Sequence, residues 1–534
     1  MARARALRPR GHAAAQVCPQ GRGSVARGLD AGPPGDEVQE RAATRGAGRP
    51  RGRRSAAGRA GAASGAEDGR AMTAQPTLPL DWPTTARLDP PEAPLAPLRY
   101  IRTVVRNPVE TWPRAVYRDR VYQSTFLGRA TLFVMDPGLV RTVLVDRAES
   151  FEKSEVLRRS LSPALGDAIL TADGARWRWQ RRAAAPIFRN ERILGFLPAM
   201  IAAAERTREA LKGLPPGTEA DLAQVMMRTT FDIIAATMLS SHGRIDVARV
   251  ERGITDYLES TSWIFALTLL RAPAWMPFPG RRRSEAARTY LRDELLRLVA
   301  EGRAGGVEGR DDLLSLLVAA RDPESGRAMD DRDVADNLLT FVTAGHETTA
   351  LALAWTLYLL ALHPAIEARV VAEVEAVTGG GPLAPHHVEA LGFTRQAIQE
   401  AMRLYPPAPV LVRAALEEVD VGGHRIGPGT PVTVPIYAIH RHALLWDEPD
   451  RFDPDRFAPE AAKARDRYAY LPFGAGPRIC IGMSFALMEA VAILAVLIRD
   501  LRFALRPGFV PTLKQRITLR PAEGMPMRVA PRAG

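Results

Sequence analysis

Apolar residues recur three and four residues apart over long stretches of the chain, and this spacing predicts helices. The predicted helices are Leu222–Leu239, Arg288–Ala300, Asp333–Leu362, Ala365–Val377 and Ala397–Leu404. Shorter runs of strand type lie at Val121–Phe126, Ala130–Val134, Val419–Val421, Pro431–Ile436 and near Ile517. We therefore expect a mainly α fold with small β-sheets, in which Asp333–Leu362 is a long helix.

The chain before about Leu98 differs in composition. Residues 1–71 hold 14 Arg, no Lys and six acidic residues, with almost no large apolar side chains. Such a segment cannot bury enough surface to offset its ordering entropy, so we expect it to lie outside the fold. Three interpretations are open: a disordered extension upstream of a natural start at Met72, an Arg-rich organelle transit peptide, or a basic arm for anionic surfaces. Residues 72–97 are proline-rich, and residues 98–534 carry the helical pattern.

Composition indicates the cellular compartment and the class of partner to expect. With only two cysteines, Cys18 and Cys480, no disulfide framework is expected, which suits a reducing compartment. The net charge of +12 comes mostly from residues 1–71, so it gives no reason to expect a nucleic-acid partner. No apolar run reaches the roughly 18–20 residues that span a bilayer, and the N-terminus lacks the apolar core of a secretory signal. We expect a soluble, cytoplasmic protein.

Cys480 lies in the glycine-rich run Phe473-Gly-Ala-Gly-Pro-Arg-Ile-Cys-Ile-Gly482, directly before the apolar stretch Met483–Ile498. A thiolate at a helix N-terminus is stabilised by free backbone N–H groups and the helix dipole. The glycines, among them Gly476, allow tight turns and the close approach of a flat ligand. Phe473 can shield the sulfur, and Arg478 can reach an anionic group. The run indicates a metal-ligating cysteine rather than a small core residue.

A second motif, Ala344-Gly-His-Glu-Thr-Thr349, lies inside the long predicted helix. Gly345 costs about 1 kcal/mol relative to Ala in mid-helix, so it needs a reason, such as space for a ligand beside the helix. Glu347 next to Thr348 pairs an acid with an alcohol, which suits proton delivery. His346 invites a ligand role, but a packed histidine is the expected interpretation.

Two other motifs place an arginine on one helix face with a partner residue. Glu400-Ala-Met-Arg403 pairs an acid with a guanidinium at i,i+3. Trp177-Arg-Trp-Gln-Arg181 puts two N–H-bearing side chains on one face at i,i+4, suited to binding a carboxylate.

In this order along the chain the motifs resemble those of the cytochrome P450 family. The matches are Trp-x-x-x-Arg, Ala-Gly-x-Glu-Thr-Thr, Glu-x-x-Arg, Phe452-Asp-Pro-Asp-Arg-Phe457 and Phe-x-x-Gly-x-Arg-x-Cys-x-Gly. The resemblance implies one P450-type domain over residues 98–534, with a long central helix over a haem b group. It implies that Cys480 binds the haem iron and that Phe473, Gly476, Arg478 and Gly482 complete its loop.

The same resemblance implies roles for residues away from this loop. Trp177, Arg181 and Arg413 would bind the haem propionates, and Gly345 would leave space for O2. Thr348 and Glu347 would manage protons at the catalytic site. Glu400, Arg403 and Arg456 would form a structural network whose loss abolishes haem incorporation. His440 is expected to serve packing.

The implied activity is that of a haem-thiolate monooxygenase that inserts one oxygen atom from O2 into a hydrophobic small molecule. No Gly-x-Gly-x-x-Gly unit is evident, so electrons are expected from a separate ferredoxin or flavodoxin-type partner with its reductase. Two alternatives stay open: a haem-thiolate peroxygenase or isomerase, and a non-catalytic haem-binding sensor. We expect a monomer.

The lid over the substrate is expected in Arg244–Arg283. It contains the apolar runs Trp263–Leu270 and Pro273–Pro279, followed by Arg281-Arg-Arg283. This pattern fits a substrate mouth, a peripheral membrane contact or ordinary lid packing. Pocket walls are expected from aliphatic positions, namely Leu339, Val342, Ala344, Leu411, Val412 and the loop Leu157–Ile169. Arg176, Arg178 and Arg182 are expected on a solvated face or at a docking site for an acidic redox partner.

Overall fold

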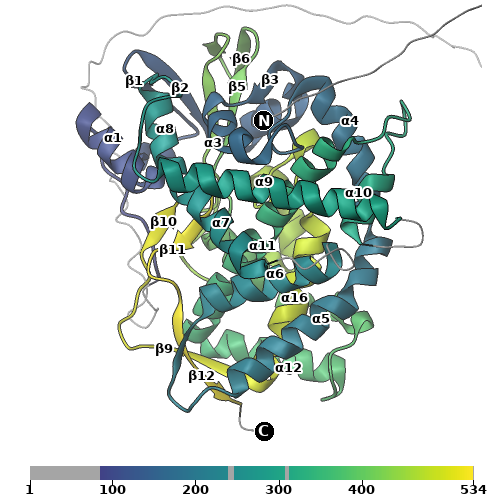
Figure 1. Ribbon diagram of the computed structural model, residues 1–534. Helices are drawn as coiled ribbons and strands as arrows, with labels where there is room; N and C mark the ends of the chain where they lie inside the picture. Colours follow the sequence, from purple (N-terminus) through teal and green to yellow (C-terminus); the bar gives the residue numbers. More distant parts are fainter. Residues whose placement is uncertain (1–84, 239–245, 307–311, 533–534) are drawn as a thin grey trace, which may run out of the picture. The chain divides into compact units, whose positions relative to one another are not determined.

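The central helix α11 (Asp331–Leu362) runs through the middle of the computed structural model, which describes residues 85–238, 246–306 and 312–532 (Figure 1). Asp330 caps its start: the Asp330 carboxylate accepts the Asp333 N–H at 2.7 Å, and the Asp333 carboxylate accepts the Asp330 N–H at 3.3 Å. The helix ends before Pro364, which begins the next helix. Residues 1–71, the first half of residues 72–97 and part of the expected lid lie outside the described residues.

Long helices pack around α11. They are α5 (Asn190–Lys212), α6 (Leu222–Met238), α9 (Arg281–Ala304), α13 (Gly392–Leu404) and α16 (Met483–Asp500). Further helices are α1 (Pro97–Arg106), α2 (Pro137–Arg141), α3 (Glu155–Leu165), α4 (Gly174–Ala184), α7 (Val247–Glu259), α8 (Thr261–Leu269), α10 (Leu313–Ala319), α12 (Pro364–Thr378), α14 (Ile436–Ile439) and α15 (Pro459–Ala464).

The strands form small sheets at the edge of this helical core. The largest has the order β1-β2-β8-β5-β3, with β1 (Val121–Phe126), β2 (Arg129–Val134), β3 (Phe151–Lys153), β5 (Leu411–Ala415) and β8 (Pro431–Val434). The others pair β4 (Glu219–Asp221), β12 (Pro526–Pro531) and β9 (Leu501–Leu505), then β10 (Leu513–Gln515) with β11 (Leu519–Pro521), and β6 (Val419–Val421) with β7 (His424–Ile426). The expected mainly α fold with small sheets is confirmed.

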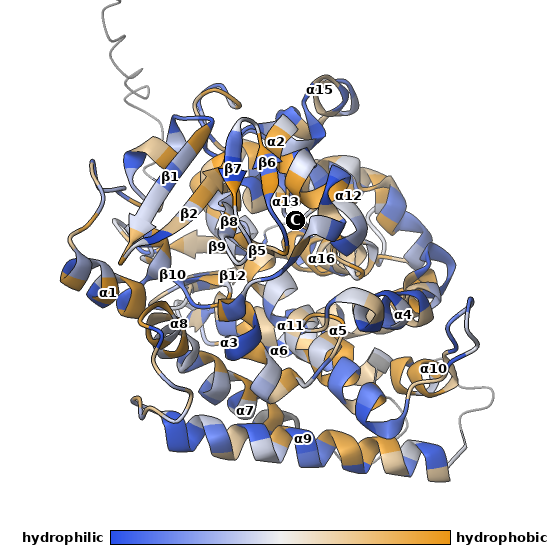
Figure 2. Cartoon of the chain, turned by 90° about the horizontal axis from the view of Figure 1, so that it is seen from above, coloured by the Kyte–Doolittle hydropathy of each residue, from blue (hydrophilic) through white to orange (hydrophobic). Residues whose placement is uncertain are grey.

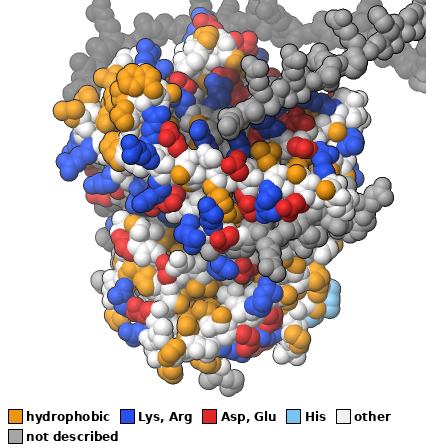
Figure 3. Space-filling view, viewed as in Figure 1, with side chains coloured by type: hydrophobic (Ala, Val, Ile, Leu, Met, Phe, Trp, Pro, Cys, Tyr) orange, Lys and Arg blue, Asp and Glu red, His pale blue; other side chains and the backbone are white. Residues whose placement is uncertain are grey.

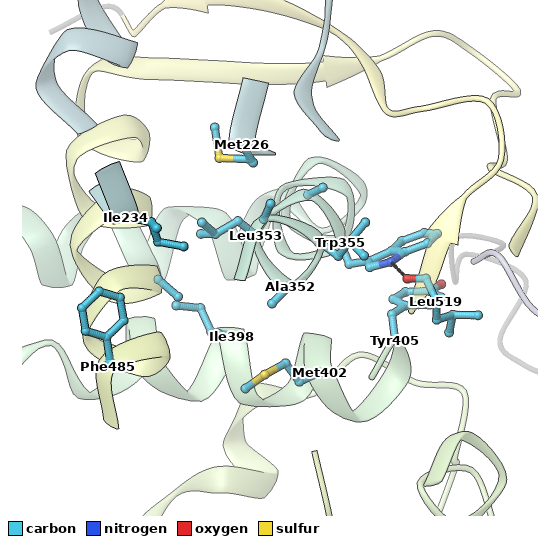
Figure 4. Packing of buried hydrophobic residues seen from close by; sticks show 14 of the residues in the cluster. Met226, Ile234, Ala352, Leu353, Trp355, Ile398, Met402, Tyr405, Phe485 and Leu519 are labelled. Carbon is cyan, nitrogen blue, oxygen red and sulfur yellow. Dashed lines mark hydrogen bonds between the residues drawn. The ribbon is translucent and has the colours of Figure 1, made fainter. Parts of the chain in front are cut away.

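One apolar core joins the central helices. Figure 4 shows side chains of α6, α11, α13 and α16 meeting, with Trp355 of α11 beside Tyr405 and Leu519. The Trp355 and Tyr405 rings are stacked, with centroids 4.1 Å apart, and Trp355 Nε1 donates to the Leu519 carbonyl at 3.4 Å. An indole buried with its N–H satisfied adds packing area at no polar cost. Figure 2 shows hydrophilic and hydrophobic residues alternating along α9, which lies at the outside of the helical core.

Two local expectations are corrected. The segment expected as the loop Leu157–Ile169 is mostly helix α3, capped by the Ser154 hydroxyl, with Pro163 inside it. The strand expected over Pro431–Ile436 ends at Val434, because Pro435 precedes the short helix α14. The strand structure expected near Ile517 is present as β10 and β11, which lie on either side of this residue.

Among the described residues, membrane-span criteria are met by no single helix. Only the bent pair of α11 and α12, which turn by 115° at their break, meets them together.

Candidate functional site

Cys480 is held on a tight loop between a 3-10 turn (Gly476–Arg478) and the start of α16. The Cys480 N–H donates to the Phe473 carbonyl at 2.9 Å, which closes the loop. Gly476 has φ +72°, and a Cβ there would lie 1.9 Å from the Leu144 carbonyl oxygen. No other residue fits this position, because the backbone conformation and the close approach both require glycine.

The thiol of Cys480 is exposed although protein surrounds it. Burial among protein groups raises the pKa of Cys480, while the Gly482 N–H and the Arg181 guanidinium act in the opposite direction. Burial therefore raises the pKa of Cys480 by more than the groups at the helix start lower it. A metal cation bound to sulfur would deprotonate such a thiol outright.

The central helix has one accessible strip. From Asp333 to Leu360 its residues are buried, except half-buried Thr343, Gly345 and Thr348 and exposed Ala344. Exposure in the middle of a buried helix marks the face on which a ligand can lie. Leu339 and Val342, expected as pocket walls, are only 2% exposed and belong to the core.

Thr348 and Glu347 differ in their environment. Thr348 Oγ1 donates to the Ala344 carbonyl at 2.7 Å, which is the i−4 bond that a mid-helix threonine makes. Glu347 is buried, accepts a hydrogen bond from Thr518 Oγ1 at 2.7 Å, and forms an ion pair with Arg520. The acid and the alcohol are thus adjacent, but the acid is engaged by the C-terminal segment.

Gly345 also has a packing role. A Cβ on this residue would lie 3.0 Å from Ile234 Cδ1 of α6, so the glycine eases the contact between the two helices. His346 is also accounted for by packing: its Nδ1 lies 3.2 Å from the Val342 carbonyl, and its ring meets Phe231 edge-on. Burial lowers the pKa of His346, which keeps it neutral.

A group of cations lies beside the cysteine loop. Antiparallel pairing of β3 with β5 places Lys153 opposite Arg413, and Arg478 of the loop pairs with Asp173 at 2.9 Å. Burial lowers the pKa of Lys153 to about 7 and that of Arg413 to about 10. Arg478 Nη1 is buried with no hydrogen-bond partner among the described residues. Arg413 and Arg478 together face the single carboxylate of Asp173, which leaves positive charge uncompensated.

Helix α4 contributes to the same place. Trp177 is 8% exposed, and the Arg478 guanidinium lies 5.3 Å from the centre of its ring. Arg181 has no carboxylate partner among the described residues, burial lowers its pKa, and the Cys480 sulfur is close enough to oppose that shift. The unpaired Arg181 guanidinium, the free Nη1 of Arg478 and the indole fit a flat ligand that carries carboxylates, as haem b does with its two propionates.

The structure brings Glu400, Arg403 and Arg456 together. Arg403 is fully buried and binds the Glu400 carboxylate through two N–H groups at 2.7 and 2.8 Å. Its remaining N–H groups donate to backbone carbonyls of His440, Pro449 and Arg451 at 2.6–2.8 Å. Arg456 Nε lies 3.6 Å from Glu400. His440 is packed as expected, with Nε2 accepting the Leu471 N–H at 2.8 Å.

Of the three arginines expected on a solvated face, Arg178 is exposed as expected, and Arg176 and Arg182 pair with buried carboxylates. Arg176 pairs with buried Asp333 at 2.6 Å, Arg182 with buried Asp322 at 2.8 Å, and Arg178 with Glu149 at 3.0 Å. The first two pairs join α4 to other parts of the chain, which corrects the expectation of a free basic face.

Sequence reasoning missed several residues of this site. Lys153 and Asp173 lie in short motifs without any pattern of their own, and Thr518 and Arg520 reach the site only through the fold. Glu489 could have been identified from the sequence, since it is the single acidic residue in the apolar stretch Met483–Ile498. Two surface cavities of about 500 and 420 Å³ lie elsewhere and include none of the predicted site residues.

Comparisons with known proteins agree with these features. The family model described as "Cytochrome P450" matches residues 113–525. The chain is 33% identical to cyclooctat-9-en-7-ol 5-monooxygenase of Streptomyces melanosporofaciens over 444 residues, covering 83% of this chain and 94% of the relative. It is 33% identical to pentalenene oxygenase of Streptomyces avermitilis over 376 residues, covering 70% and 81%.

A solved structure is similar as well. The haem domain of cytochrome P450DA superimposes with a TM-score of 0.73 at 26% identity, covering 84% of this chain and 99% of that domain.

Proposed function

The chain belongs to the cytochrome P450 family and is a haem b-dependent monooxygenase, and we propose that it hydroxylates a hydrophobic small molecule of the terpenoid or other lipid-like kind. We propose that its electrons come from a separate ferredoxin or flavodoxin-type protein with its reductase. The two bacterial relatives act, by their names, on an alkenol and an alkene, which carry few polar groups. This supports a substrate held mainly by apolar contacts.

The observation that carries the proposal is that the Cys480 thiol is exposed and that Ala344 and Thr348 form an accessible strip on an otherwise buried helix. Cys480 would bind the haem iron, and Arg181, Arg413, Arg478 and Trp177 would hold the propionates. When bound, the haem supplies the chemistry of O2 activation and C–H oxidation, and the protein supplies position and protons.

Thr348 and Glu347 of α11 would have different roles in proton transfer. Thr348 Oγ1 donates to Ala344 in the structure, so its lone pairs can accept a hydrogen bond from the ligand side. Glu347 is held by Thr518 and Arg520, and transfer of a proton from its carboxyl group requires a change in those contacts. An adjacent acid and alcohol favour O2 over peroxide as the oxidant.

The first test is the absorption spectrum of the reduced, CO-treated protein. Iron bound by a thiolate gives a Soret band at longer wavelength than iron without one, and we expect that band in the wild type. Cys480→Ser should lose it, while Cys18→Ser, the matched change at the other cysteine, should keep it. The proposed role of Cys480 would be contradicted if both variants kept the band. It would also lose its support if both variants lost the band.

The second test is turnover of apolar candidate substrates. Product should require O2, reductant and an added ferredoxin with its reductase. Product formed from hydrogen peroxide alone at a comparable rate would favour the peroxygenase alternative. A second protein ligand on the iron, seen in the spectrum of the resting protein, would favour the sensor.

A further inference from the structure

Arg465, the residue that follows α15, lies among aromatic rings and not beside a carboxylate. On the face of the molecule in Figure 3, Lys and Arg side chains are intermingled with Asp and Glu. Arg465 is half-buried and has no ion-pair partner among the described residues, and its Nη1 donates to the Arg456 carbonyl at 2.9 Å. A partly buried cation without an acid needs another source of stabilisation.

Three rings supply that stabilisation, and we name Trp446, Phe457 and Tyr470 the ring cage. The Arg465 guanidinium carbon lies 4.8, 4.5 and 5.7 Å, respectively, from the centres of these rings. A cation within about 6 Å of a ring centre is attracted to the ring, and more strongly where water is excluded. Trp446 and Phe457 are buried and form an apolar cluster separate from the main core, so much of the ring cage is dry.

On one side the ring cage contacts the buried network of Glu400 and Arg403. Trp446 is close to two guanidiniums, since its ring centre lies 4.9 Å from Arg403 and 4.8 Å from Arg465. Its Nε1 donates to the Ile439 carbonyl at 3.0 Å, which fixes the indole. Figure 2 shows α15 at the outer edge of the described structure. The ring cage therefore joins a cation near the surface to one that is fully buried.

On its other side the ring cage contacts His440. The Tyr470 and His440 rings are stacked with centroids 5.2 Å apart, and the Tyr470 hydroxyl donates to the Gln399 carbonyl at 2.9 Å. His440 Nε2 accepts the Leu471 N–H at 2.8 Å. Burial lowers the pKa of His440 to about 3, so the ring is neutral and Nε2 keeps the lone pair that this hydrogen bond requires.

Backbone hydrogen bonds continue from Leu471 to the cysteine loop. The Leu471 carbonyl accepts the Gly474 N–H at 3.0 Å, and the Phe473 carbonyl accepts the Cys480 N–H at 2.9 Å. A change in the position of Leu471 would therefore be passed on to the thiol. Groups that orient a metal ligand from outside affect how firmly it binds, often by a factor of ten or more.

We propose that Arg465 is a positioning residue: it holds the ring cage together and thereby fixes Tyr470, His440 and the loop that presents the Cys480 sulfur. This inference rests on the proposed function, in which Cys480 binds the haem iron. Without the cation the rings lose their common partner, and the His440 ring loses the support that keeps its Nε2 directed at Leu471. We therefore expect the thiolate to leave the iron more readily.

The test follows the CO-treated, reduced protein over time at a temperature well below unfolding. Loss of the thiolate converts the long-wavelength Soret band to one at shorter wavelength. Arg465→Met removes the charge and should speed this conversion by about tenfold. Arg465→Lys keeps a cation for the rings and should stay within about threefold of wild type. Arg467→Met is the matched control, because Arg467 lies over the Tyr468 ring at 5.4 Å outside the ring cage, and it should convert as wild type does.

A general loss of stability is tested with a core change elsewhere. Val529 is buried in β12, which pairs with β4 and β9. Val529→Ala leaves a cavity and should lower the midpoint of urea unfolding, yet convert at the wild-type rate. A faster conversion in this variant, in proportion to its lost stability, would show that the rate follows stability and not the position of the loop.

The route through Tyr470 is tested with a second substitution. Tyr470→Leu removes the ring that stacks on His440 and should itself speed the conversion. Adding Arg465→Met to Tyr470→Leu should then change the rate by less than about twofold, because the ring through which Arg465 acts is gone. This variant also tests the ring cage independently of how well Arg465→Met takes up haem.

Three results would overturn the inference. The first is conversion at the wild-type rate in both Arg465→Met and Tyr470→Leu. The second is a full effect of Arg465→Met in the Tyr470→Leu background, which would assign Arg465 another route to the loop. The third is a wild type that never shows the long-wavelength band. That result would also contradict the proposed function, and it is seen before any variant is compared, so the two failures are distinguishable.

Discussion

Glu489 is a carboxyl group buried in the middle of the apolar helix α16. It is fully buried, and neither carboxyl oxygen has a hydrogen-bond partner among the described residues. Burial raises the pKa of Glu489 to about 8, and the nearby Thr349 hydroxyl only partly opposes this. A carboxyl group in such surroundings avoids the cost of a buried charge by staying protonated.

This raised pKa makes stability depend on pH. Between about pH 4.5 and 8 the unfolded chain releases the Glu489 proton and the folded protein keeps it, so stability falls as pH rises, by at most about 1.4 kcal/mol per pH unit. Glu489→Gln should flatten that decline and be more stable than wild type at pH 8 by a few kcal/mol. Urea unfolding at a series of pH values measures this, with exposed Glu375→Gln as the control. Parallel profiles for wild type and Glu489→Gln would contradict it.

Arg403 allows a buried ion pair to be compared with an exposed one of the same geometry. Arg403→Met leaves the Glu400 carboxylate and three carbonyls unpaired in the core, and should cost about 3–5 kcal/mol with loss of haem binding. Arg369 binds Asp455 through two bonds of 2.8 Å, but both side chains are about half exposed. Arg369→Met should therefore cost less than about 1 kcal/mol. Denaturant unfolding compares the two, and equal losses would contradict the difference in burial.

Individual residues show where sequence reasoning ends. The loop around Cys480 could be predicted because glycine, arginine and cysteine at fixed spacing have few structural interpretations. The environment of each side chain could not. The sequence gives no sign that burial would raise the pKa of Cys480 by more than the helix start lowers it. It also gives no sign that a Cβ at position 345 would meet Ile234.

At the level of elements, the contact between α11 and α6 depends on Gly345. Alanine at this position gains about 1 kcal/mol of helix propensity, but its Cβ meets Ile234 Cδ1 at 3.0 Å. We expect Gly345→Ala alone to change stability little. In the background of Ile234→Val, which removes that methyl group, the same change should stabilise by about 1 kcal/mol.

A double-mutant cycle of these two changes measures the coupling through thermal unfolding. Coupling of about 0.5–1 kcal/mol supports helix packing as the reason for the glycine. Additive effects would show that Ile234 does not restrict this position. The glycine would then be explained by the space that it leaves for a ligand on the haem side of the helix.

Elements with a long apolar period were predicted well, and those without one were not. The predicted helix Asp333–Leu362 differs from α11 by two residues at its start, since the capping box at Asp330 starts the helix at Asp331. Helix α3 was expected as part of a loop, and Pro163 lies inside it. Proline in the helix interior usually signals a break, and tertiary packing overrides that signal here.

Across the whole molecule, the C-terminal segment returns to the central helix. Thr518 and Arg520 are more than 170 positions from Glu347 in sequence, yet both bind its carboxylate. Asn107 near the start of the described chain is tied to the same hairpin, where it donates to the Leu513 carbonyl and accepts the Gln515 N–H, each at 2.8 Å. Such long-range contacts leave no periodic pattern, so the family resemblance could predict the acid and the alcohol but not what holds the acid.

This arrangement predicts that Arg520 positions Glu347. Arg520→Gln removes the cation and leaves the buried carboxylate with the Thr518 hydroxyl, which should cost roughly 1.5–3 kcal/mol of stability. If the proposed monooxygenase uses Glu347 to deliver protons, the fraction of consumed O2 that appears as hydroxylated product should also change. The change should be absent when Arg520→Gln is added to Glu347→Gln, because the carboxylate that Arg520 holds is already gone.

Thr518→Val is the control for loss of the neighbouring hydrogen bond alone. An effect of Arg520→Gln on product yield that persists in the Glu347→Gln background would show that Arg520 acts on catalysis by another route, since a purely structural role would lower stability and leave the product yield per O2 unaltered.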